Sequence, residues 1–431
     1  MTCYGKRQLV AAVIVAVFLA GMQVAAQEQS ATVEDAMTAL SQKPITVHAK
    51  SSVLMEANSG QILVASNKDE KIPPASFAKL LTLYVVFDML HKGKISLSDD
   101  VYISRKAWQT GGSKMFVALD TKVPLEELIK GIAVVSGNDA CVAIAEHLYG
   151  STEAFVQVMN ETAQRLGMHN SHFANPHGLP SEDQYTTAED MAILARRYIS
   201  DFPEVLQYHS LQEYTYGDIH QANRNRLLRK DPTVDGLKTG YIEEAGYHLL
   251  ATAKRDERRL IAVVMGTERP IIREEEALKL LNYGFRNFSF ITLFTPGEVL
   301  HTLRVWKGKA GTLPVVAKES GLLVIPEEYK NKVVQEDILP DHLTAPIIQD
   351  HEIGKRLVKV DNHVIRAIPL LASVDIERAG LIKILYHNIY LSIRGKTIIY
   401  VALGLVAISM VIALISLLKR RRRRRRVQIR W

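Results

Sequence analysis

A run of 22 residues without a charged side chain, 397–418, constrains this chain more than any other stretch. As a helix it would be about 33 Å long, which is enough to cross the hydrocarbon core of a bilayer. Lys419 and the arginine run 420–426 follow at once, and each such charge would cost roughly 2.5–3.5 kcal/mol at the bilayer centre. The sequence therefore predicts a transmembrane helix over 397–418 and a basic cytoplasmic tail over 419–431.

The N-terminus has the pattern of an export signal. Lys6 and Arg7 precede an apolar run, 9–20, and Val24-Ala25-Ala26 supplies the small residues that a signal peptidase needs. We expect residues 1–26 to be a signal peptide that is cut after Ala26. A retained N-terminal anchor is the alternative, for which the apolar run is short against a bilayer of about 30 Å.

The formal net charge of +7 comes from the two ends of the chain. Residues 397–431 hold nine Lys and Arg and no acid, so the stretch 27–396 is mildly acidic. The surplus therefore indicates membrane topology and not a nucleic-acid partner. We expect a single-pass protein of the inner (cytoplasmic) membrane with its body on the extracytoplasmic side. Loss of Cys3 with the signal leaves Cys141 as the only thiol, so no intrachain disulfide is expected.

The pattern of residue types divides the exported part into three segments. Residues 27–290 alternate hairpin and helix patterns and form the expected catalytic domain. Beyond Pro296, short β-branched runs such as 300–306 and 322–325 predict a β-rich domain over 291–376. Residues 377–396 alternate apolar and basic side chains at helical spacing, which predicts an amphipathic linker helix.

Within 27–290, two hairpins bracket a helical middle. Strand-like runs over 53–56 and 61–65 flank a turn, and runs over 247–253 and 259–265 flank a charged turn, 254–258. The expected helices include one that ends at Gly167, one that begins at Thr187 and one that Gly284 closes. These helices cover 153–166, 187–199 and 274–281, and two further helical stretches cover 125–135 and 140–148.

Ser76 and Lys79 form the first candidate for chemistry. Pro73 and Pro74 precede them and an apolar run follows, which places Ser76 near the start of a buried helix. Residues three apart share a helix face, so the amine lies within reach of the hydroxyl and can act as its general base. Spacing alone proves little, because Ser416 and Lys419 have the same spacing beside the predicted membrane span.

Two tripeptides supply context. Ser136-Gly137-Asn138 interrupts two apolar helical stretches, which predicts a short loop that holds a hydroxyl and an amide inward; an ordinary turn is the alternative. Lys238-Thr239-Gly240 immediately precedes the second hairpin, and a charged edge strand with a glycine bulge is its alternative reading. Their joint presence, in this order after Ser76, is improbable by chance.

With these motifs the chain resembles the serine penicillin-recognising enzymes, which carry Ser-x-x-Lys, Ser-x-Asn and Lys-Thr-Gly. It is most similar to the low-molecular-mass D-alanyl-D-alanine carboxypeptidases over about residues 40–290. Matching segments include 112–116, 175–179, 223–225 and 235–246. The resemblance implies an α+β fold: a serine β-lactamase/DD-peptidase-like domain with an antiparallel sheet flanked by helices, then a small all-β domain. Phe77-Ala78 and Ile242 depart from the family pattern, which bears on substrate preference.

The resemblance also implies a role for each matching residue. Ser76 would attack the D-Ala–D-Ala carbonyl, Lys79 would take its proton, and Ser136 would relay a proton to the leaving amine. The residues implied to bind substrate are Asn138 for its amide, Lys238 and Thr239 for its carboxylate, Gly240 for clearance along the strand, the backbone N–H of Tyr241 with that of Ser76 for the oxyanion, and Arg224 and Arg273 near the carboxylate. For the two arginines, surface solvation is the alternative reading.

The expected partners are peptidoglycan stem peptides ending in D-Ala–D-Ala, β-lactams that acylate Ser76, and the membrane. No cofactor is expected, and the charge distribution gives no reason to expect a nucleic-acid partner. No metal is expected either, since no second His stands at ligand spacing from His177, which we interpret as a packing residue. Cys141 is interpreted as a core residue. A β-lactamase stays open, although the sequence has no acidic motif with the flanking pattern of its water-activating Glu; Glu182 and Asp183 lie in a comparable stretch. A transpeptidase and an idle wall-binding scaffold also stay open.

Overall fold

The computed structural model describes residues 45–427, without the side chains of 387–399, 402 and 420–427. The predicted signal peptide over 1–26 and its cleavage site lie outside the described residues. The described chain divides into two units. The first runs to Leu293 and also takes in Leu322–Val333, and the second holds Phe294–Gly321 and the chain from Val334 onward.

A five-stranded antiparallel sheet forms the centre of the first unit. In order across the sheet, its strands are β2 (Ile62–Ser66), β1 (Ser51–Glu56), β9 (Arg258–Thr267), β8 (Gly246–Arg255) and β7 (Val234–Ile242). Both predicted hairpins are confirmed, as the pairs β1–β2 and β8–β9. The strands β8 and β9 extend further than predicted, so that Arg255 pairs with Arg258 and the turn between them is only two residues long.

Side chains that alternate along each strand fill two separate cores. Val53 and Met55 of β1 belong to one apolar cluster, whereas Leu54 between them belongs to the other. The same alternation recurs on β9, where Val263 faces the first cluster and Val264 faces the second. Because successive strand residues point to opposite faces, one sheet can support helices on both sides.

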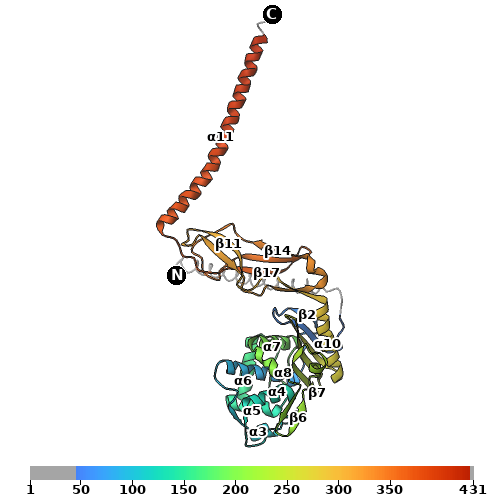
Figure 1. Cartoon of the computed structure of the whole chain (residues 1–431). Coiled ribbons are helices and arrows are strands. Elements are labelled where there is room, and N and C mark those ends of the chain that lie inside the picture. Colours follow the sequence, from blue (N-terminus) through green and yellow to red (C-terminus); the bar gives the residue numbers. More distant parts are fainter. Residues whose placement is uncertain (1–44, 428–431) are drawn as a thin grey trace, which may run out of the picture. The chain divides into compact units, whose positions relative to one another are not determined.

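Helices cover both faces of this sheet (Figure 1). The second core lies under α10 (Pro270–Asn287), and the helices of the middle segment pack around the first core. These helices are α2 (Ala78–His91), α3 (Arg105–Gln109), α4 (Leu125–Val135), α5 (Asn138–Tyr149), α6 (Thr152–Leu166), α7 (Ala188–Asp201) and α8 (Leu206–His209). The short helix α9 (Leu227–Lys230) instead contributes Leu227 and Leu228 to the second core. Short 3-10 turns are η1 (Ala75–Phe77) and η2 (Pro203–Val205), and small hairpins pair β3 (Asp100–Tyr102) with β4 (Lys122–Pro124) and β5 (Glu213–Tyr216) with β6 (Ile219–Ala222).

Two of the predicted helix ends are confirmed by their caps. Gly167 follows α6 in the left-handed conformation, with φ at 91°, as expected for a glycine that closes a helix. Thr187 accepts a hydrogen bond from the backbone N–H of Asp190 at 3.1 Å, which satisfies one of the free donors at the start of α7.

Gly284 does not close a helix, and that prediction is wrong. α10 continues through it to Asn287. A Cβ at this position would lie 2.6 Å from Cδ1 of Leu260 and 2.9 Å from Cδ2 of Leu54. The glycine is therefore needed for the close approach of α10 to the sheet, which only tertiary packing reveals.

The second unit contains a six-stranded sheet. Its strands, in order, are β14 (Val333–Ile338), β16 (Glu352–Val360), β17 (His363–Ala372), β12 (Thr312–Val316), β11 (Val299–Trp306) and β15 (His342–Thr344). Residues Leu322–Val333, which the sequence assigned to the β-rich domain, lie with the first unit. There β13 (Leu322–Pro326) pairs with β10 (Phe288–Thr292), and η3 (Glu327–Lys332) follows it.

A single helix, α11 (Leu381–Val427), carries the predicted linker from Leu381 onward, the predicted span, and the predicted tail as far as Val427. Residues 428–431 of the tail lie outside the described residues. The linker and the span are thus continuous, without a break near residue 396. In the part of the chain that the structure describes, no helix combines the length and the apolar character required to cross a membrane. The predicted transmembrane helix over 397–418 is therefore not confirmed.

Replacing Gly284 by Ala should destabilise the first unit. In an unobstructed helix interior this change stabilises by about 1 kcal/mol, but here the added Cβ meets Leu260 and Leu54, and such overpacking costs about 1–3 kcal/mol. Urea unfolding of both chains measures the difference. Glu275→Ala, on the exposed face of α10, is the control, and a stabilised Gly284→Ala chain would contradict the packing argument.

Candidate active site

Ser76 lies in the turn η1, directly before α2. Pro73 and Pro74 lead into this turn, and Ala75 adopts a positive φ of 47°. Lys79 is on the first turn of α2, and its Nζ lies 2.9 Å from Oγ of Ser76. The structure therefore brings the hydroxyl and the amine of the predicted pair into hydrogen-bond contact.

Lys79 has no exposed surface. Its Nζ also donates to the backbone carbonyl of His177 at 2.5 Å, which orients the side chain toward Ser76. Burial lowers the pKa of Lys79 to about 8, and the positive charge of Arg224 acts in the same direction. At pH 7 about a tenth of the amine is then neutral, the form that a general base requires.

The loop 175–179 holds Lys79 in place, which the sequence did not reveal. A Cβ on Gly178 would lie 1.7 Å from the carbonyl oxygen of Ala75, so only glycine allows this loop to approach the Ser76 turn. Asn175 accepts from the backbone N–H of Gly178 at 2.7 Å and fixes the loop. Burial lowers the pKa of His177 to about 3, so its ring is neutral and its carbonyl is the part that contacts Lys79. The sequence showed the segment 175–179 as a motif. It could not show the contact of Lys79 with the backbone carbonyl of His177, because residue types do not reveal backbone contacts.

Ser136 and Asn138 reach the same place from the loop between α4 and α5. Ser136 is in the left-handed conformation, with φ at 64°, and its Oγ lies 3.0 Å from Oγ of Ser76. Asn138, the first residue of α5, donates from Nδ2 to the carbonyl of Gly111 at 2.7 Å. The inward loop that the tripeptide predicted is confirmed.

Asp139, the next residue, organises the cavity wall and was not singled out from the sequence. Its buried carboxylate accepts from the backbone N–H groups of Met115 and Phe116 at 3.0 and 2.9 Å. It therefore holds the segment after Gly112 and Ser113, both of which line the cavity.

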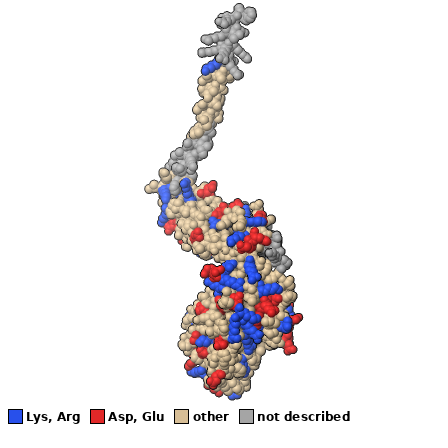
Figure 2. Space-filling model, turned by 45° about the vertical axis from the view of Figure 1, so that its right-hand side comes forward, with Lys and Arg blue, Asp and Glu red and all other residues tan. Residues whose placement is uncertain are grey.

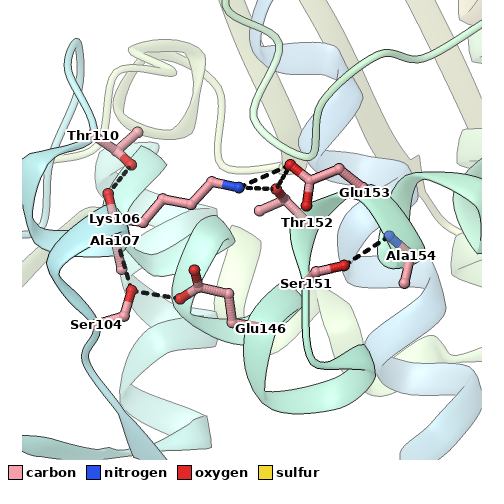
Figure 3. A network of polar contacts seen from close by, with 9 residues as sticks. All are labelled: Ser104, Lys106, Ala107, Thr110, Glu146, Ser151, Thr152, Glu153 and Ala154. Atoms are coloured by element: carbon pink, nitrogen blue, oxygen red, sulfur yellow. Dashed lines mark hydrogen bonds and ion pairs between the residues drawn. The ribbon is translucent and has the colours of Figure 1, made fainter.

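A polar network fixes the helix that leads into this wall (Figure 3). Ser104, at the start of α3, donates to Glu146 of α5 at 2.6 Å. Lys106 of α3 donates to Glu153 of α6 at 2.9 Å. These contacts hold α3 against α5 and α6, and the glycine loop 111–112 follows directly.

The third motif lies on β7, at the edge of the sheet. Lys238 is 2% exposed, and burial, followed by the charge of Lys79, lowers its pKa well below the ordinary value. A Cβ on Gly240 would lie 3.2 Å from Cβ of Ala75, so the glycine lets the Ser76 turn pack against the strand. Tyr241 is half exposed and stacks on Tyr247, with ring centroids 4.3 Å apart.

Arg273 and Arg224 differ in their surroundings. Arg273 is only 8% exposed, so surface solvation does not describe it. Its Nη1 donates to the carbonyl of Gly240 at 3.1 Å, and its buried Nε has no hydrogen-bond partner among the described residues. Arg224 is exposed on the same cavity, as the alternative reading allowed.

These segments enclose a cavity of about 500 Å³. Eight of the ten predicted site residues line it, whereas Lys79 and Lys238 are buried beside it. The lining consists of Ser76, Gly112, Ser113, Ser136, Asn138, His177, Gly178, Leu179, Arg224, Thr239, Gly240, Tyr241, Ile242, Tyr247 and Arg273. It has two arginines and no carboxylate, so it suits an anionic ligand.

Cys141 has a clear place in the fold. Cys141 is fully buried, and burial raises the pKa of its thiol to about 12, which fits its interpretation as a core residue and not a nucleophile. Among the described residues, no group of three or more His, Cys, Asp or Glu side chains is arranged to hold a metal ion.

Comparison with known proteins agrees with this geometry. Residues 36–269 match the family model of the D-alanyl-D-alanine carboxypeptidases, peptidase family S11, and residues 288–378 match the C-terminal domain of penicillin-binding protein 5. The chain is 38% identical to carboxypeptidase DacC of Escherichia coli (78% of this chain, 86% of the relative) and 39% identical to DacA of Haemophilus influenzae (82% and 91%).

A solved structure of penicillin-binding protein 5 from Haemophilus influenzae superposes with a TM-score of 0.75 at 38% identity, over 78% of this chain and 99% of that one. The predicted DD-peptidase fold with a C-terminal all-β domain is thereby confirmed. The chain belongs to the D-alanyl-D-alanine carboxypeptidase family and is a serine-type carboxypeptidase of the penicillin-binding class.

Proposed function

We propose that this enzyme removes the terminal D-alanine of peptidoglycan stem peptides, with Ser76 as nucleophile and Lys79 as general base. One observation carries the proposal: Oγ of Ser76 lies 2.9 Å from Nζ of Lys79 and 3.0 Å from Oγ of Ser136, at a cavity without acidic lining. Nucleophile and base within hydrogen-bond reach are what covalent acyl transfer requires.

Acylation proceeds by proton transfer along these contacts. Neutral Lys79 takes the proton of Ser76 as Oγ forms a bond to the carbonyl carbon of the scissile peptide. The backbone N–H groups of Ser76 and Tyr241 stabilise the resulting oxyanion, an interaction whose loss typically costs about 3–4 kcal/mol. Ser136 passes the proton from Lys79 to the leaving nitrogen, the C–N bond breaks, and D-alanine departs. Water then hydrolyses the ester and restores Ser76.

The cations of the cavity support binding of the substrate's free carboxylate. Lys238 and Thr239 hold it, with Arg273 and Arg224 beside them, and Asn138 binds the amide of the peptide. Figure 2 shows Lys and Arg side chains gathered on one face of the first unit, with Asp and Glu side chains among them. The charge of Arg224 also disfavours protonation of Lys79, because like charges repel each other.

Slow deacylation of the β-lactam adduct is expected because the cleaved amide nitrogen stays attached to the acyl group and hinders water, and the cavity lining has no carboxylate to activate that water. Glu182 and Asp183 are exposed, and neither lines the cavity. Nothing in the cavity lining therefore favours a fast β-lactamase. A transpeptidase would need an amine instead of water to attack the acyl-enzyme. The residues that line the cavity do not form a separate binding site for such an amine.

The enzyme acts outside the cytoplasm in this proposal, at the inner membrane, since stem peptides of the wall lie there. The signal pattern over 1–26 and the uncharged segment 397–418 support export and attachment by the C-terminal helix. Fractionation of cells that carry the chain with and without residues 397–431 tests attachment. Recovery of both chains in the membrane fraction would contradict it.

Substituting Ser76 by Ala should abolish both labelling by fluorescent penicillin and release of D-alanine from a peptide ending in D-Ala–D-Ala. The removed oxygen is the atom that forms the acyl bond, so the loss should be complete while the melting temperature stays close to that of the parent. Ser416→Ala is the matched control, since Ser416 and Lys419 repeat the spacing outside the cavity. Labelled Ser76→Ala protein would refute the assignment.

Acylation should depend on pH through Lys79. Its pKa is lowered to about 8, so the neutral base is a minority below that pH and the acylation rate should fall about tenfold per pH unit under it. Above about pH 8 the rate should level off. Stopped-flow labelling between pH 6 and 9 measures the profile. Lys79→Arg, which stays charged, should bind penicillin without acylation, and a flat profile would exclude Lys79 as the base.

Penicillin should remain bound to Ser76 long after D-alanine turnover from a peptide is complete under the same conditions. The reason is that the cleaved amide nitrogen of penicillin stays attached to the acyl group and hinders water, whereas D-alanine leaves the cavity. The cavity lining also has no Asp or Glu that would activate a hindered water. Decay of the label after removal of free penicillin gives the rate. Rapid decay with accumulation of hydrolysed penicillin would instead identify a β-lactamase.

A further inference from the structure

His248 lies in β8 with no exposed surface, and both of its ring nitrogens are engaged. The backbone N–H of Gly266, on β9, donates to Nδ1 at 2.9 Å. Nε2 lies 3.1 Å from the carbonyl oxygen of Pro73, three residues before Ser76. The imidazole therefore connects the sheet to the chain that enters the nucleophile turn.

The two partners decide the form of the ring. A backbone N–H only donates, so Nδ1 must carry a lone pair, and a carbonyl only accepts, so Nε2 must carry the hydrogen. Burial lowers the pKa of His248 to about 4, and the positive charges of Arg273 and Lys50 act in the same direction. The ring is thus the neutral Nε2–H tautomer at neutral pH.

The same residue contacts the other parts of the site. The ring of Phe77, next to Ser76, packs on it with centroids 5.5 Å apart. A Cβ on Gly240 would lie 3.3 Å from its Cδ2, so β7 also rests against it. Its carbonyl accepts from Nη1 of Arg273 at 3.4 Å. One residue thereby touches the nucleophile turn and the strand that carries Lys238.

We propose that His248 is a positioning residue for acylation: its Nε2–H bond to Pro73 sets the distance between the Ser76 turn and the edge of β7. The inference rests on the proposed role of Ser76 as nucleophile. His248 does not contact the reacting atoms, and it acts by holding Oγ of Ser76 where the substrate carbonyl bound along β7 arrives. Misplacement of a reacting atom by about 1 Å can cost on the order of a hundredfold in rate.

Two amide substitutions separate the two hydrogen bonds. The amide of Gln stands near the place of Nε2 and can donate to Pro73, whereas the shorter Asn can accept from Gly266 but does not reach Pro73. We expect His248→Gln to acylate within about threefold of the parent. We expect His248→Asn to lose on the order of tenfold to a hundredfold in the saturating acylation rate, with little change in the penicillin concentration at half-saturation.

The measurement is stopped-flow acylation of the full chain by fluorescent penicillin, analysed for rate at saturation and for half-saturation separately, beside melting temperatures. A purely structural role predicts that both variants lose stability alike and keep the parental rate once folded. Phe155→Leu is the control for stability, because Phe155 is fully buried in α6 and lines no part of the cavity. It should lower the melting temperature without changing the acylation rate.

Equal rates for the Gln and Asn variants, or a parental rate for His248→Asn, would overturn the inference. The outcome is distinguishable from failure of the proposed function. If Ser76→Ala still becomes labelled, the nucleophile assignment fails. If Ser76→Ala is inert while the two His248 variants acylate alike, only the positioning role of His248 fails.

Discussion

The contact between Oγ of Ser76 and Nζ of Lys79 depends on keeping an amine neutral inside a protein. Burial supplies the main effect, since desolvation disfavours the charged form and lowers the pKa of Lys79. The positive charge of Arg224 acts in the same direction, and the cavity lining offers no carboxylate that would stabilise a charged amine. The other residues of the site keep the hydroxyl of Ser76 and the amine of Lys79 in contact and exclude water from them.

Close backbone approach is how the fold achieves this enclosure. Gly178 and Gly240 stand where a Cβ would press on the residue before Ser76, and Gly284 lets α10 approach the opposite face of the sheet. The Ser76 turn is therefore held by the loop that follows Pro176 and by β7. Side chains complete the enclosure: Asp139 ties down the segment after Ser113 through backbone N–H groups, and His248 joins the turn to β8 and β9.

The residue types predicted those structural features that depend on neighbouring residues in the sequence. Predictions failed for features that depend on contacts between distant parts of the chain. Alternating strands, the cap at Thr187 and the loop at Ser136 followed from periodicity and backbone preferences. Gly284 was misread, because a glycine near a helix end has the same appearance whether it closes the helix or makes room for Leu54. The carbonyl of His177 and the buried guanidinium of Arg273 were beyond prediction, since burial and backbone contacts are properties of the folded chain.

The chemical groups, their order and the family follow from the amino-acid sequence alone, because three short motifs with a fixed order are rare by chance and each places its side chains by local geometry. The convergence of these groups in one cavity follows from tertiary packing. The groups come from the turn before α2, from a loop between two helices and from an edge strand. Ser76 and Lys238, the most distant pair in the sequence, are 162 positions apart. Their distances, and the loss of water that lowers the pKa of each lysine, arise when packing removes the space between them.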